Sequence, residues 1–428
     1  MTLPTPCSHP APCGVPCELN VGPERHAVLE LGNLARLAVL MVPASRGSFR
    51  QQAEDLFAQL LCLVSRQTTP LAATTMMIFL RDGSDEVECR EVIRARFGET
   101  GPVTTFVVQP PCCGAALGVE LWALGGPGVK VKRFGPHLLS AESEGIRWIH
   151  CGGISGQAGT GGAYGESLSA FRKMRQQLAV AGVGFDQVVR TWLYVNQITG
   201  GEEGGQRYQE LNRARTDFYG GIDLCAKNRA PGAPTTIYPA STGIGTGGAN
   251  VAMSCMALES KRTDVFLLPL ENPRQTAAYD YQAIYSPQSP KFSRAVAVVQ
   301  GHFVSTLVSG TASILNSQTC HVGDIVRQTA QTIDNIERLI APENFARHGL
   351  RGAGATLQDI AKLRVYVKYW QDYEKCRDVV ERRLPRVPVI YLHADVCRPN
   401  LLVEIEAVAF SAFAPNGTPR EINESRRS

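Results

Sequence analysis

The chain has 428 residues, of which 44% are hydrophobic and 19% are charged, and its formal net charge is +4. This composition is typical of globular proteins and excludes the disordered and membrane-embedded classes. The charge is small, and no basic run is interleaved with aromatic residues, so nothing indicates nucleic-acid binding. The apolar runs are shorter than a membrane span, and residues 1–20 lack a signal-peptide pattern. We therefore expect a cytoplasmic protein without a nucleic-acid or membrane partner.

The length suits roughly three domains at about 150 residues each. A leader rich in proline and cysteine precedes the first periodic segment, and a polar tail follows the last one. We expect the leader at 1–25, three units at 26–135, 136–270 and 271–412, and the tail at 413–428. The leader is expected to be flexible.

The thirteen cysteines are odd in number and include no CxxC pair. This pattern favours reduced, mostly buried thiols over a disulfide framework. In the leader, Cys7, His9, Cys13 and Cys17 are possible zinc ligands, but their spacing matches no familiar zinc finger. We therefore favour a leader without metal, and we expect no metal or cofactor elsewhere.

One order of elements occurs three times: an amphipathic helix, a strand, a second helix and a closing strand of alternating polarity. The first copy has a helix over 49–61, a strand over 75–80 and a closing strand over 118–124. The second copy has a helix from near Ser167, a strand over 188–195, a second helix over 208–218 and a closing strand over 251–258. The third copy has the same elements over 324–339, 361–367, 373–383 and 402–410. Asp324 is expected to cap its helix. The pattern predicts an α+β chain built from three copies of one unit.

The closing strand of the third copy contains the most informative residue, Glu404, between Val403 and Ile405. If Glu404 is buried, desolvation raises the pKa of its carboxyl, which can then hold a proton at neutral pH. Strand alternation places Glu404 and Glu406 on one face, so both are exposed or both have a reason to be buried. The strand alone favours neither alternative.

The three closing strands can be aligned on an alanine that each one contains. Alignment on Ala123, Ala257 and Ala407 places Glu120, Ser254 and Glu404 at one position. At this aligned position the first and third copies have a glutamate, whereas the second has a serine. Structural drift and the specialisation of one cleft would both produce this outcome, and the repeat does not choose between them.

The order of elements and the segment Val403-Glu-Ile-Glu-Ala407 resemble the Rid (YjgF) superfamily, whose members are homotrimers with ligand sites between subunits. The resemblance covers about residues 26–411 and is weakest in the first copy. It implies three Rid-like, chorismate-mutase-like units that form a pseudo-trimer within one chain. A monomer or a weak homo-oligomer would follow.

Seven segments of the second and third copies are similar to the chorismatases in particular. They are Arg190-Thr-Trp-Leu-Tyr194, Tyr208-x6-Arg215, Pro239-Ala-Ser-Thr-Gly-Ile-Gly245, Tyr285-Ser-Pro-x-Ser-Pro290, Ser309-Gly-Thr-Ala-Ser313, His321-x-Gly-Asp324 and Ala394-Asp-Val-Cys-Arg398. Each segment alone is a weak signal, but seven in the expected order are specific.

Chorismatases convert chorismate to pyruvate and a ring product without metal or organic cofactor. Members that form 3-hydroxybenzoate have a glycine and a cysteine at two selective positions, which Gly310 and Cys397 match. The resemblance therefore implies formation of 3-hydroxybenzoate, with chorismate as the small-molecule partner. The long segment before the second copy leaves room for 4-hydroxybenzoate as another product.

We interpret Glu404 and Cys397 as catalytic. Glu404 would protonate the enolpyruvyl group of chorismate, and general acid catalysis of this type contributes about 10²–10⁴-fold. Cys397 would relay a proton or shape the pocket, although an inert buried thiol is the more common role. The candidate substrate-binding residues are Tyr208, Arg215, Thr242, Gly243, Gly245, Gly310, Arg364 and Tyr391.

The binding candidates have ordinary alternatives. Arg215 follows Tyr208 by seven residues, which places both on the same face of a helix, and its guanidinium suits a substrate carboxylate. A surface salt bridge is the ordinary alternative for an arginine. Arg364 is a weaker candidate with surface exposure as its alternative, and Tyr391 fits the core equally well. Glycines such as Gly245 suit tight turns as well as ligand contacts.

Three other functions remain as alternatives. A chorismatase could release the dihydroxycyclohexadiene carboxylate, and the same scaffold could serve as a noncatalytic ligand-binding protein. Rid-type enamine or imine deamination is disfavoured because the segments 102–105, 234–237 and 388–391 lack the arginine that holds the substrate carboxylate in those enzymes.

Overall fold

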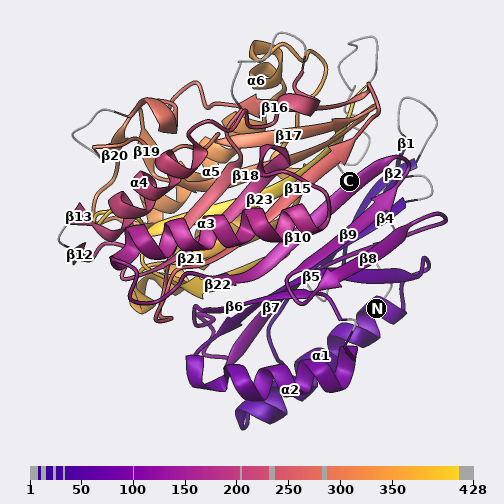
Figure 1. Cartoon of the computed structure of the whole chain (residues 1–428), viewed down its shortest axis with the longest axis horizontal. Helices are drawn as coiled ribbons and strands as arrows, with labels where there is room; N and C mark the ends of the chain where they lie inside the picture. Colours follow the sequence, from indigo (N-terminus) through magenta and orange to yellow (C-terminus); the bar gives the residue numbers. More distant parts are fainter. Residues whose placement is uncertain are drawn as a thin grey trace.

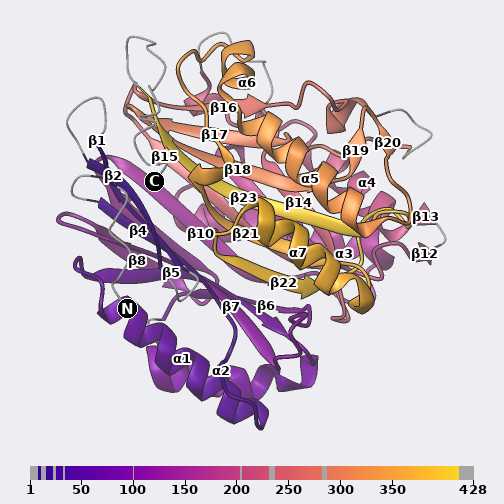
Figure 2. The ribbon, with the colours of Figure 1, turned by 180° about the vertical axis from the view of Figure 1, so that it is seen from behind.

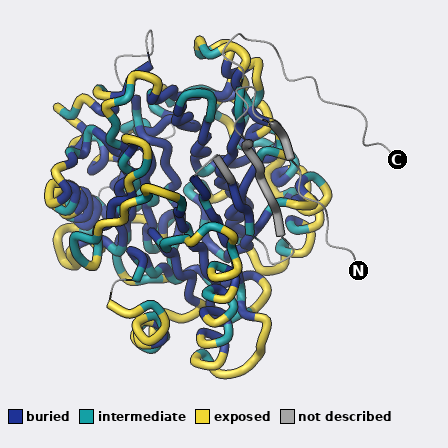
Figure 3. Tube along the Cα trace, turned by 90° about the vertical axis from the view of Figure 1, so that its right-hand side faces the viewer, coloured by how far each residue is buried: buried dark blue, intermediate teal, exposed yellow. Residues whose placement is uncertain are grey.

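The computed structural model describes residues 8–10, 16–22, 26–31, 34–99, 101–202, 205–230, 237–281 and 287–413. Within these ranges, three mixed sheets occupy the interior and the long helices lie on the outside, on three different sides of the molecule (Figures 1 and 2). Buried residues are concentrated in the strands. Figure 3 shows the buried segments running through the middle of the molecule, with exposed segments at its edges. No helix in the described part of the chain is long and apolar enough to cross a membrane.

The first sheet has the order β1-β2-β3-β4-β7-β5-β6. Its strands are β1 (Ser8–Pro10), β2 (Pro16–Gly22), β3 (His26–Leu31), β4 (Leu34–Met41), β5 (Leu71–Leu80), β6 (Val103–Val108) and β7 (Leu117–Gly125), with helices α1 (Phe49–Ser65) and α2 (Glu86–Phe97). Two segments of the leader, expected to be flexible, thus extend a sheet. Of the leader's possible zinc ligands, Cys7 and Cys13 lie outside the described residues.

The second sheet has the order β14-β11-β15-β10-β9-β8. Its strands are β8 (Lys130–Gly135), β9 (Leu138–Ser143), β10 (Ile146–Ser155), β11 (Val188–Asn196), β14 (Ala240–Thr246) and β15 (Ala252–Ser260), with α3 (Gly162–Val180) and α4 (Arg207–Tyr219). A small hairpin of β12 (Gly201–Glu202) and β13 (Gly205–Gln206) precedes α4. Because β8 pairs with β9, it belongs to the second sheet, although it precedes the expected boundary at residue 135.

The third sheet has the order β16-β17-β18-β23-β21-β22. Its strands are β16 (Val265–Leu270), β17 (Ala295–Gln300), β18 (Phe303–Ala312), β21 (Ile360–Val367), β22 (Val389–His393) and β23 (Val403–Ala412), with α5 (Ile325–Ile340), α6 (Pro342–Arg347) and α7 (Tyr373–Arg383). A two-strand hairpin pairs β19 (Ile314–Leu315) with β20 (Gln318–Thr319). Asp324 caps α5 by accepting a hydrogen bond from the backbone N–H of Arg327, as expected.

The three sheets share one core order of strands. It reads β3-β4-β7-β5-β6 in the first sheet, β9-β10-β15-β11-β14 in the second and β17-β18-β23-β21-β22 in the third. The sheets contact each other in cyclic order, through β6 with β10, β14 with β18, and β22 with β4. Each outermost parallel strand therefore lies against the next sheet, which creates three equivalent seams.

Helical periodicity explains how the outer layer attaches to the sheets. In α5, Ile325, Ile333, Ile336 and Ile340 are buried at a spacing that places them on one face of the helix. They belong to the same hydrophobic cluster as the helix-facing residues of the third sheet. Two other clusters, under α1 with α2 and under α3 with α4, are built in the same way.

The register of the closing strands corrects the predicted alignment of the copies. In each sheet, the closing strand pairs with its antiparallel neighbour through a ladder that contains one irregularity of one residue. The residue pairs next to this irregularity are Ala73 with Ala123, Val188 with Ala257, and Ile360 with Ala409. By this register Glu406, not Glu404, corresponds to Glu120 and Ser254, so the alignment on Ala407 was wrong by two residues. A shift of two residues keeps every side chain on its face, so alternation could not detect the error.

Candidate active site

A cavity of about 650 Å³ lies where the second and third sheets meet, and we call it the interface cleft. Its walls come from α4, β14, β18, β23 and the loop before β23. Its lining residues include Tyr208, Arg215, Ser241, Gly243, Phe292, Arg294, Gly310, Cys397, Arg398 and Glu404. The cleft thus collects six of the ten residues predicted from the sequence: Tyr208, Arg215, Gly243, Gly310, Cys397 and Glu404.

Glu404 is buried, with 4% of its surface exposed, which decides between the two alternatives that the sequence left open. Burial raises the pKa of its carboxyl to about 8, and the nearby charge of Glu406 adds to this effect. The cations Arg190 and Arg294 act in the opposite direction without reversing the shift. The side chain therefore keeps its proton at neutral pH and can act as a general acid.

Gly310 makes room for the Glu404 carboxyl. It lies in β18 at the point where the register with β23 shifts, between Val308 and Thr311. A Cβ atom at Gly310 would lie 2.9 Å from the carboxyl carbon of Glu404 and 3.2 Å from Cγ2 of Thr242. Any side chain at this position would therefore have to displace the carboxyl.

Arg215, on α4, is 2% exposed. Its guanidinium donates to Oδ1 of Asn212 at 2.5 Å and to Oγ of Ser241 at 3.4 Å, and its Nε has no hydrogen-bond partner among the described residues. In the described part of the chain no carboxylate lies within ion-pair distance of it. The predicted alternative of a surface salt bridge is wrong, and the charge of Arg215 is available to an anionic ligand.

Arg294 was missed by the sequence reasoning. It is 3% exposed and donates to the backbone oxygen of Thr276 at 3.1 Å and to the hydroxyl of Tyr281. A cation directly before the apolar run 295–299 was the available signal. Arg398, within one of the quoted segments, also lines the cleft and donates to the backbone oxygen of Ser317 at 2.8 Å.

Tyr208 and Gly243 fit against each other across the cleft. A Cβ atom at Gly243 would lie 3.0 Å from Cε2 of Tyr208, so the glycine admits the aromatic ring. Burial raises the pKa of the Tyr208 phenol, which stays protonated at neutral pH. The phenol is therefore a neutral hydrogen-bonding group.

Cys397 lines the cleft near Glu404. Burial raises the pKa of its thiol to about 12, and the charge of Glu404 contributes in the same direction. At neutral pH the group is a thiol and a poor nucleophile. Its chemistry is therefore limited to a weak hydrogen bond, proton relay through the S–H group, or the shape of the wall.

Thr242 and Gly245 do not line the cleft but support it from behind. The Thr242 hydroxyl donates to Oε2 of Glu406 at 2.6 Å and accepts from the backbone N–H of Gly310 at 3.1 Å. The N–H of Gly245 donates to the backbone oxygen of Asp395 at 2.9 Å. The contact between Thr242 and Gly310 fixes β18 beside β14, and the contact between Gly245 and Asp395 fixes the loop that carries Cys397.

Arg364 and Tyr391 also lie away from the cleft. Arg364 is 1% exposed rather than on the surface, and its Nε donates to Oε2 of Glu120 at 2.5 Å. Tyr391 packs in the core of the third sheet, with its ring 5.4 Å from that of Tyr373. Neither side chain lines the cleft, because Arg364 is held in an ion network and Tyr391 is packed in the core.

The ion network that holds Arg364 spans all three sheets. Lys362 lies 2.8 Å from Glu120, and Glu406 lies 3.0 Å from Arg190 and 3.3 Å from Arg364. Burial raises the pKa of Glu120, but Arg364 and Lys362 more than offset this, and its pKa is lowered to about 2. The same balance, dominated by Arg364 and Arg190, lowers the pKa of Glu406. Both carboxylates are charged.

Within the described ranges no group of three or more histidine, cysteine or acidic side chains is placed to hold a metal ion. The ionisable side chains that line the interface cleft include the protonated carboxyl of Glu404, the thiol of Cys397, the phenols of Tyr208 and Tyr281, and the guanidinium groups of Arg215, Arg294 and Arg398.

Comparison with known proteins agrees with the fold. The family described as Endoribonuclease L-PSP matches residues 286–411. A crystal structure of a chorismatase has the same fold, with a TM-score of 0.63 at 23% identity, covering 89% of this chain and 100% of that chain. These matches define an α+β protein with a chorismatase-like fold and an L-PSP-type domain over residues 286–411.

Two relatives from Streptomyces hygroscopicus are more specific. A 3-hydroxybenzoate synthase is 33% identical over 276 residues, which are 62% of this chain and 77% of the relative. A chorismatase is 33% identical over 276 residues, which are 63% of this chain and 75% of the relative. The chain belongs to the chorismatase family.

Proposed function

We propose that the chain is a cofactor-independent chorismatase that converts chorismate to 3-hydroxybenzoate and pyruvate in the interface cleft. The observation that carries this proposal is Glu404, a buried carboxyl with a raised pKa among several guanidinium groups. Chorismate offers an acid-labile enol ether and two carboxylates, and the cleft provides groups complementary to both.

The reaction begins with transfer of the Glu404 proton to the methylene carbon of the enolpyruvyl group. The oxocarbenium ion that forms is trapped by water or by the neighbouring ring hydroxyl, and cleavage of a C–O bond then releases pyruvate. The ring becomes aromatic by losing a ring proton, and where water was the trap, one molecule of water leaves the ring in this step. The atoms of chorismate equal those of 3-hydroxybenzoate plus pyruvate, so the overall conversion requires no oxidant or reductant. As the proton leaves, the new carboxylate of Glu404 faces the developing cation and stabilises it.

Arg215 and Arg294 are the groups that we assign to the two substrate carboxylates. Both are buried, and each has an Nε without a hydrogen-bond partner in the described part of the chain. A guanidinium and a carboxylate form two parallel hydrogen bonds, which fix orientation as well as affinity. Binding through both would hold the enol ether against Glu404.

We assign product choice to Gly310 and Cys397, in keeping with their match to the 3-hydroxybenzoate-forming members. Gly310 sets the position of the acid, and Cys397 presents a neutral thiol beside it. A second product, 4-hydroxybenzoate, is part of the same proposal. Release of the cyclohexadiene diol instead would add one water to chorismate.

We also propose that each sheet with its helices is one Rid-like unit, so that the chain is a pseudo-trimer. The expected bounds 26–135, 136–270 and 271–412 then shift, because β8 belongs to the second sheet and β16 to the third. The shared strand order and the cyclic contacts between sheets support this architecture. A chain that contains all three units completes its own clefts, so a monomer suffices for activity.

The test is incubation of the purified protein with chorismate alone, followed by chromatography of the products. We expect equal amounts of pyruvate and hydroxybenzoate. Absence of pyruvate would refute the enzyme assignment, and pyruvate with only the cyclohexadiene diol would refute the roles of Gly310 and Cys397. A Rid-type deaminase is not favoured, because β6, β14 and β22 contain no arginine.

A further inference from the structure

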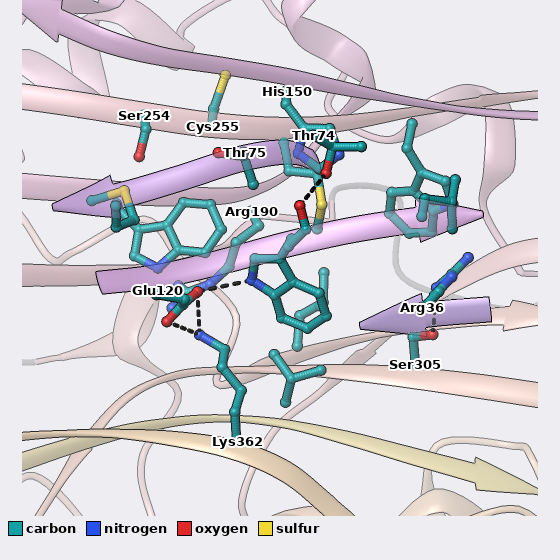
Figure 4. A pocket seen from close by; sticks show the side chains of 18 of the residues that line it. Arg36, Thr74, Thr75, Glu120, His150, Arg190, Ser254, Cys255, Ser305 and Lys362 are labelled. Carbon is teal, nitrogen blue, oxygen red and sulfur yellow. Dashed lines mark hydrogen bonds and ion pairs between the residues drawn. The ribbon is translucent and has the colours of Figure 1, made fainter. Parts of the chain in front are cut away.

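A second cavity, of about 90 Å³, lies between the inner faces of the three sheets, and we call it the axial cavity (Figure 4). It shares no lining residue with the interface cleft. A space of this size holds several water molecules or a small organic molecule. The proposed chemistry of the cleft does not use it.

Strand geometry divides the axial cavity into three layers. Inward residues two apart on a strand are about 6.6 Å apart, and the closing strands supply one residue each to a layer. The inner layer contains Glu120, Ser254 and Glu406; the middle layer contains Trp122, Met256 and Val408. The outer layer lies two residues further along the closing strands, at Leu124 and Phe410. Arg36 pairs with Leu124 and Ser305 pairs with Phe410, so Arg36 and Ser305 lie in this layer. The acids are therefore about 13 Å from Arg36 along the strands.

The walls have an excess of positive charge. Their ionised side chains are the cations Arg36, Arg190, Lys362 and Arg364 and the carboxylates Glu120 and Glu406. The last three cations pair with the two carboxylates, whereas the hydrogen bonds of the Arg36 guanidinium to other described residues go to neutral groups. These are Oγ of Ser305 at 3.3 Å and Oε1 of Gln300 at 3.4 Å.

Arg36 remains charged although it lacks a counter-ion among the described residues. Burial lowers its pKa to about 10, which is still well above neutral pH. Arg36 is partly exposed, so water screens part of its charge. A partly buried charge without a partner of opposite sign still costs free energy, and folded proteins normally supply one. Figure 4 shows Arg36 beside Ser305 and apart from the Glu120–Lys362 pair.

Two further donors in the walls lack hydrogen-bond partners within the described ranges: Nε1 of Trp148, whose side chain is 7% exposed, and Oγ of Ser254, 5% exposed. Trp148 belongs to the Arg36 layer, and the guanidinium carbon of Arg36 lies 5.1 Å from its ring centre. A cation and an unsatisfied N–H therefore occupy one end of the cavity, and an unsatisfied hydroxyl occupies the other.

We propose that the axial cavity binds a small aromatic monocarboxylate. Its carboxylate pairs with Arg36 and the Trp148 N–H, its ring lies in the middle layer against Trp122, Met256 and Val408, and a ring hydroxyl can reach Ser254. The ligand supplies the missing negative charge. A halide would satisfy only the outer layer and leave the apolar middle layer empty.

Fluorescence offers a direct test, because three of the four tryptophans line the axial cavity and none lines the cleft. The fourth, Trp370, is exposed, so Trp370→Phe removes the background signal. Titration of this variant with sodium benzoate should change its tryptophan emission saturably. Acetate and chloride at equal ionic strength should not compete.

Arg36→Met keeps the aliphatic stem but removes the charge, and we expect it to weaken benzoate binding at least about tenfold. Trp148→Phe keeps an aromatic ring but removes the N–H, and we expect a severalfold loss. Arg215→Met, in the interface cleft, should leave the emission change intact. Benzoate should also raise the Tm of the parent protein but not of Arg36→Met.

The proposal is overturned if benzoate produces no saturable change, or if Arg36→Met binds it as tightly as the parent. Competition by acetate or chloride at similar concentrations would overturn the aromatic part. If Arg36→Met fails to fold, Trp148→Phe and the Tm shift decide. These measurements use no chorismate, so they stand or fall independently of the proposed catalytic activity.

Discussion

Glu404 and Glu406 lie two residues apart on β23, and their carboxyls are perturbed in opposite directions. Burial raises the pKa of Glu404 to about 8, whereas Arg364 and Arg190 overcome burial at Glu406 and lower its pKa. The Thr242 hydroxyl, bonded to Glu406 and to the N–H of Gly310, connects the two surroundings. One strand thus holds a charged carboxylate towards the axial cavity and a protonated acid towards the cleft.

Substitution Glu404→Gln should abolish proton transfer while keeping the size of the side chain. We expect the rate of pyruvate release to fall by about 10²–10⁴-fold. Chorismate should still bind, because Arg215 and Arg294 are unchanged; calorimetry with the variant measures this. Retention of more than a tenth of the parent rate would show that another group supplies the proton.

The pH dependence of kcat/KM should follow the protonation of Glu404. The active form is the protonated acid, and its pKa is about 8, so activity should be level below that pH and fall above it. The decline should approach tenfold per pH unit. An activity that instead increases through pH 8 would contradict the role of Glu404 as the acid.

Substitution Glu406→Gln tests how the neighbouring charge acts. Removal of a negative charge beside Glu404 makes its deprotonation easier, so the descending limb of the pH profile should move to lower pH. A purely structural effect would lower the rate at every pH without moving the limb. The measurement is the full kcat/KM profile of the variant beside that of the parent.

Substitution Gly310→Ala should disturb the acid without unfolding the protein, because the added Cβ meets the Glu404 carboxyl. We expect at least about a tenfold loss of kcat, since small displacements of a catalytic group are costly. Gly201→Ala is the matched control, because a Cβ at Gly201 has no neighbour within 4 Å in the part of the chain that the structure describes. Equal rates for the two variants would refute the steric role of Gly310.

Substitution Cys397→Ala should change the ratio of ring products, measured by chromatography after complete conversion of chorismate. Because burial keeps Cys397 as a thiol, its removal should affect partitioning more than the initial protonation. Cys320→Ala, outside the cleft lining, is the control. Identical product ratios in all three proteins would exclude a selective role for Cys397.

Substitution Glu120→Gln should destabilise the fold, because Lys362 and Arg364 would lose the carboxylate that they share. Breaking a buried pair costs about 3–5 kcal/mol, which urea unfolding can measure. Glu88→Gln removes an exposed partner of Arg50 and should cost at most about 1 kcal/mol. Similar losses for both variants would contradict the importance of burial.

The elements of the fold were predictable because periodicity is local. The helix expected over 373–383 is α7 with the same bounds, and the strand expected over 361–367 is β21 with one residue added. The register between strands was not predictable, since it depends on irregularities that leave alternation unchanged. For this reason Glu404 was first matched to Glu120.

The candidate site was predictable only in part, because the cleft joins two sheets. Glu404 and Arg215 could be proposed from residue type and resemblance, but the burial of Glu404 depends on β14 of another sheet. Thr242 and Arg364 belong to the correct strands, yet their side chains meet the ion network rather than the cleft. Arg294 was missed because its neighbours in sequence are ordinary strand residues.

The corrected register has a consequence for stoichiometry. Glu404 pairs with Tyr366, and the equivalent positions in the other two sheets are Gly118, which pairs with Phe79, and Ala252, which pairs with Tyr194. A carboxyl therefore occurs at only one of these three equivalent positions. A ring of identical chains would repeat any substitution at every seam, whereas a single polypeptide can vary each seam separately. An active-site titration should therefore count one reactive acid for each polypeptide.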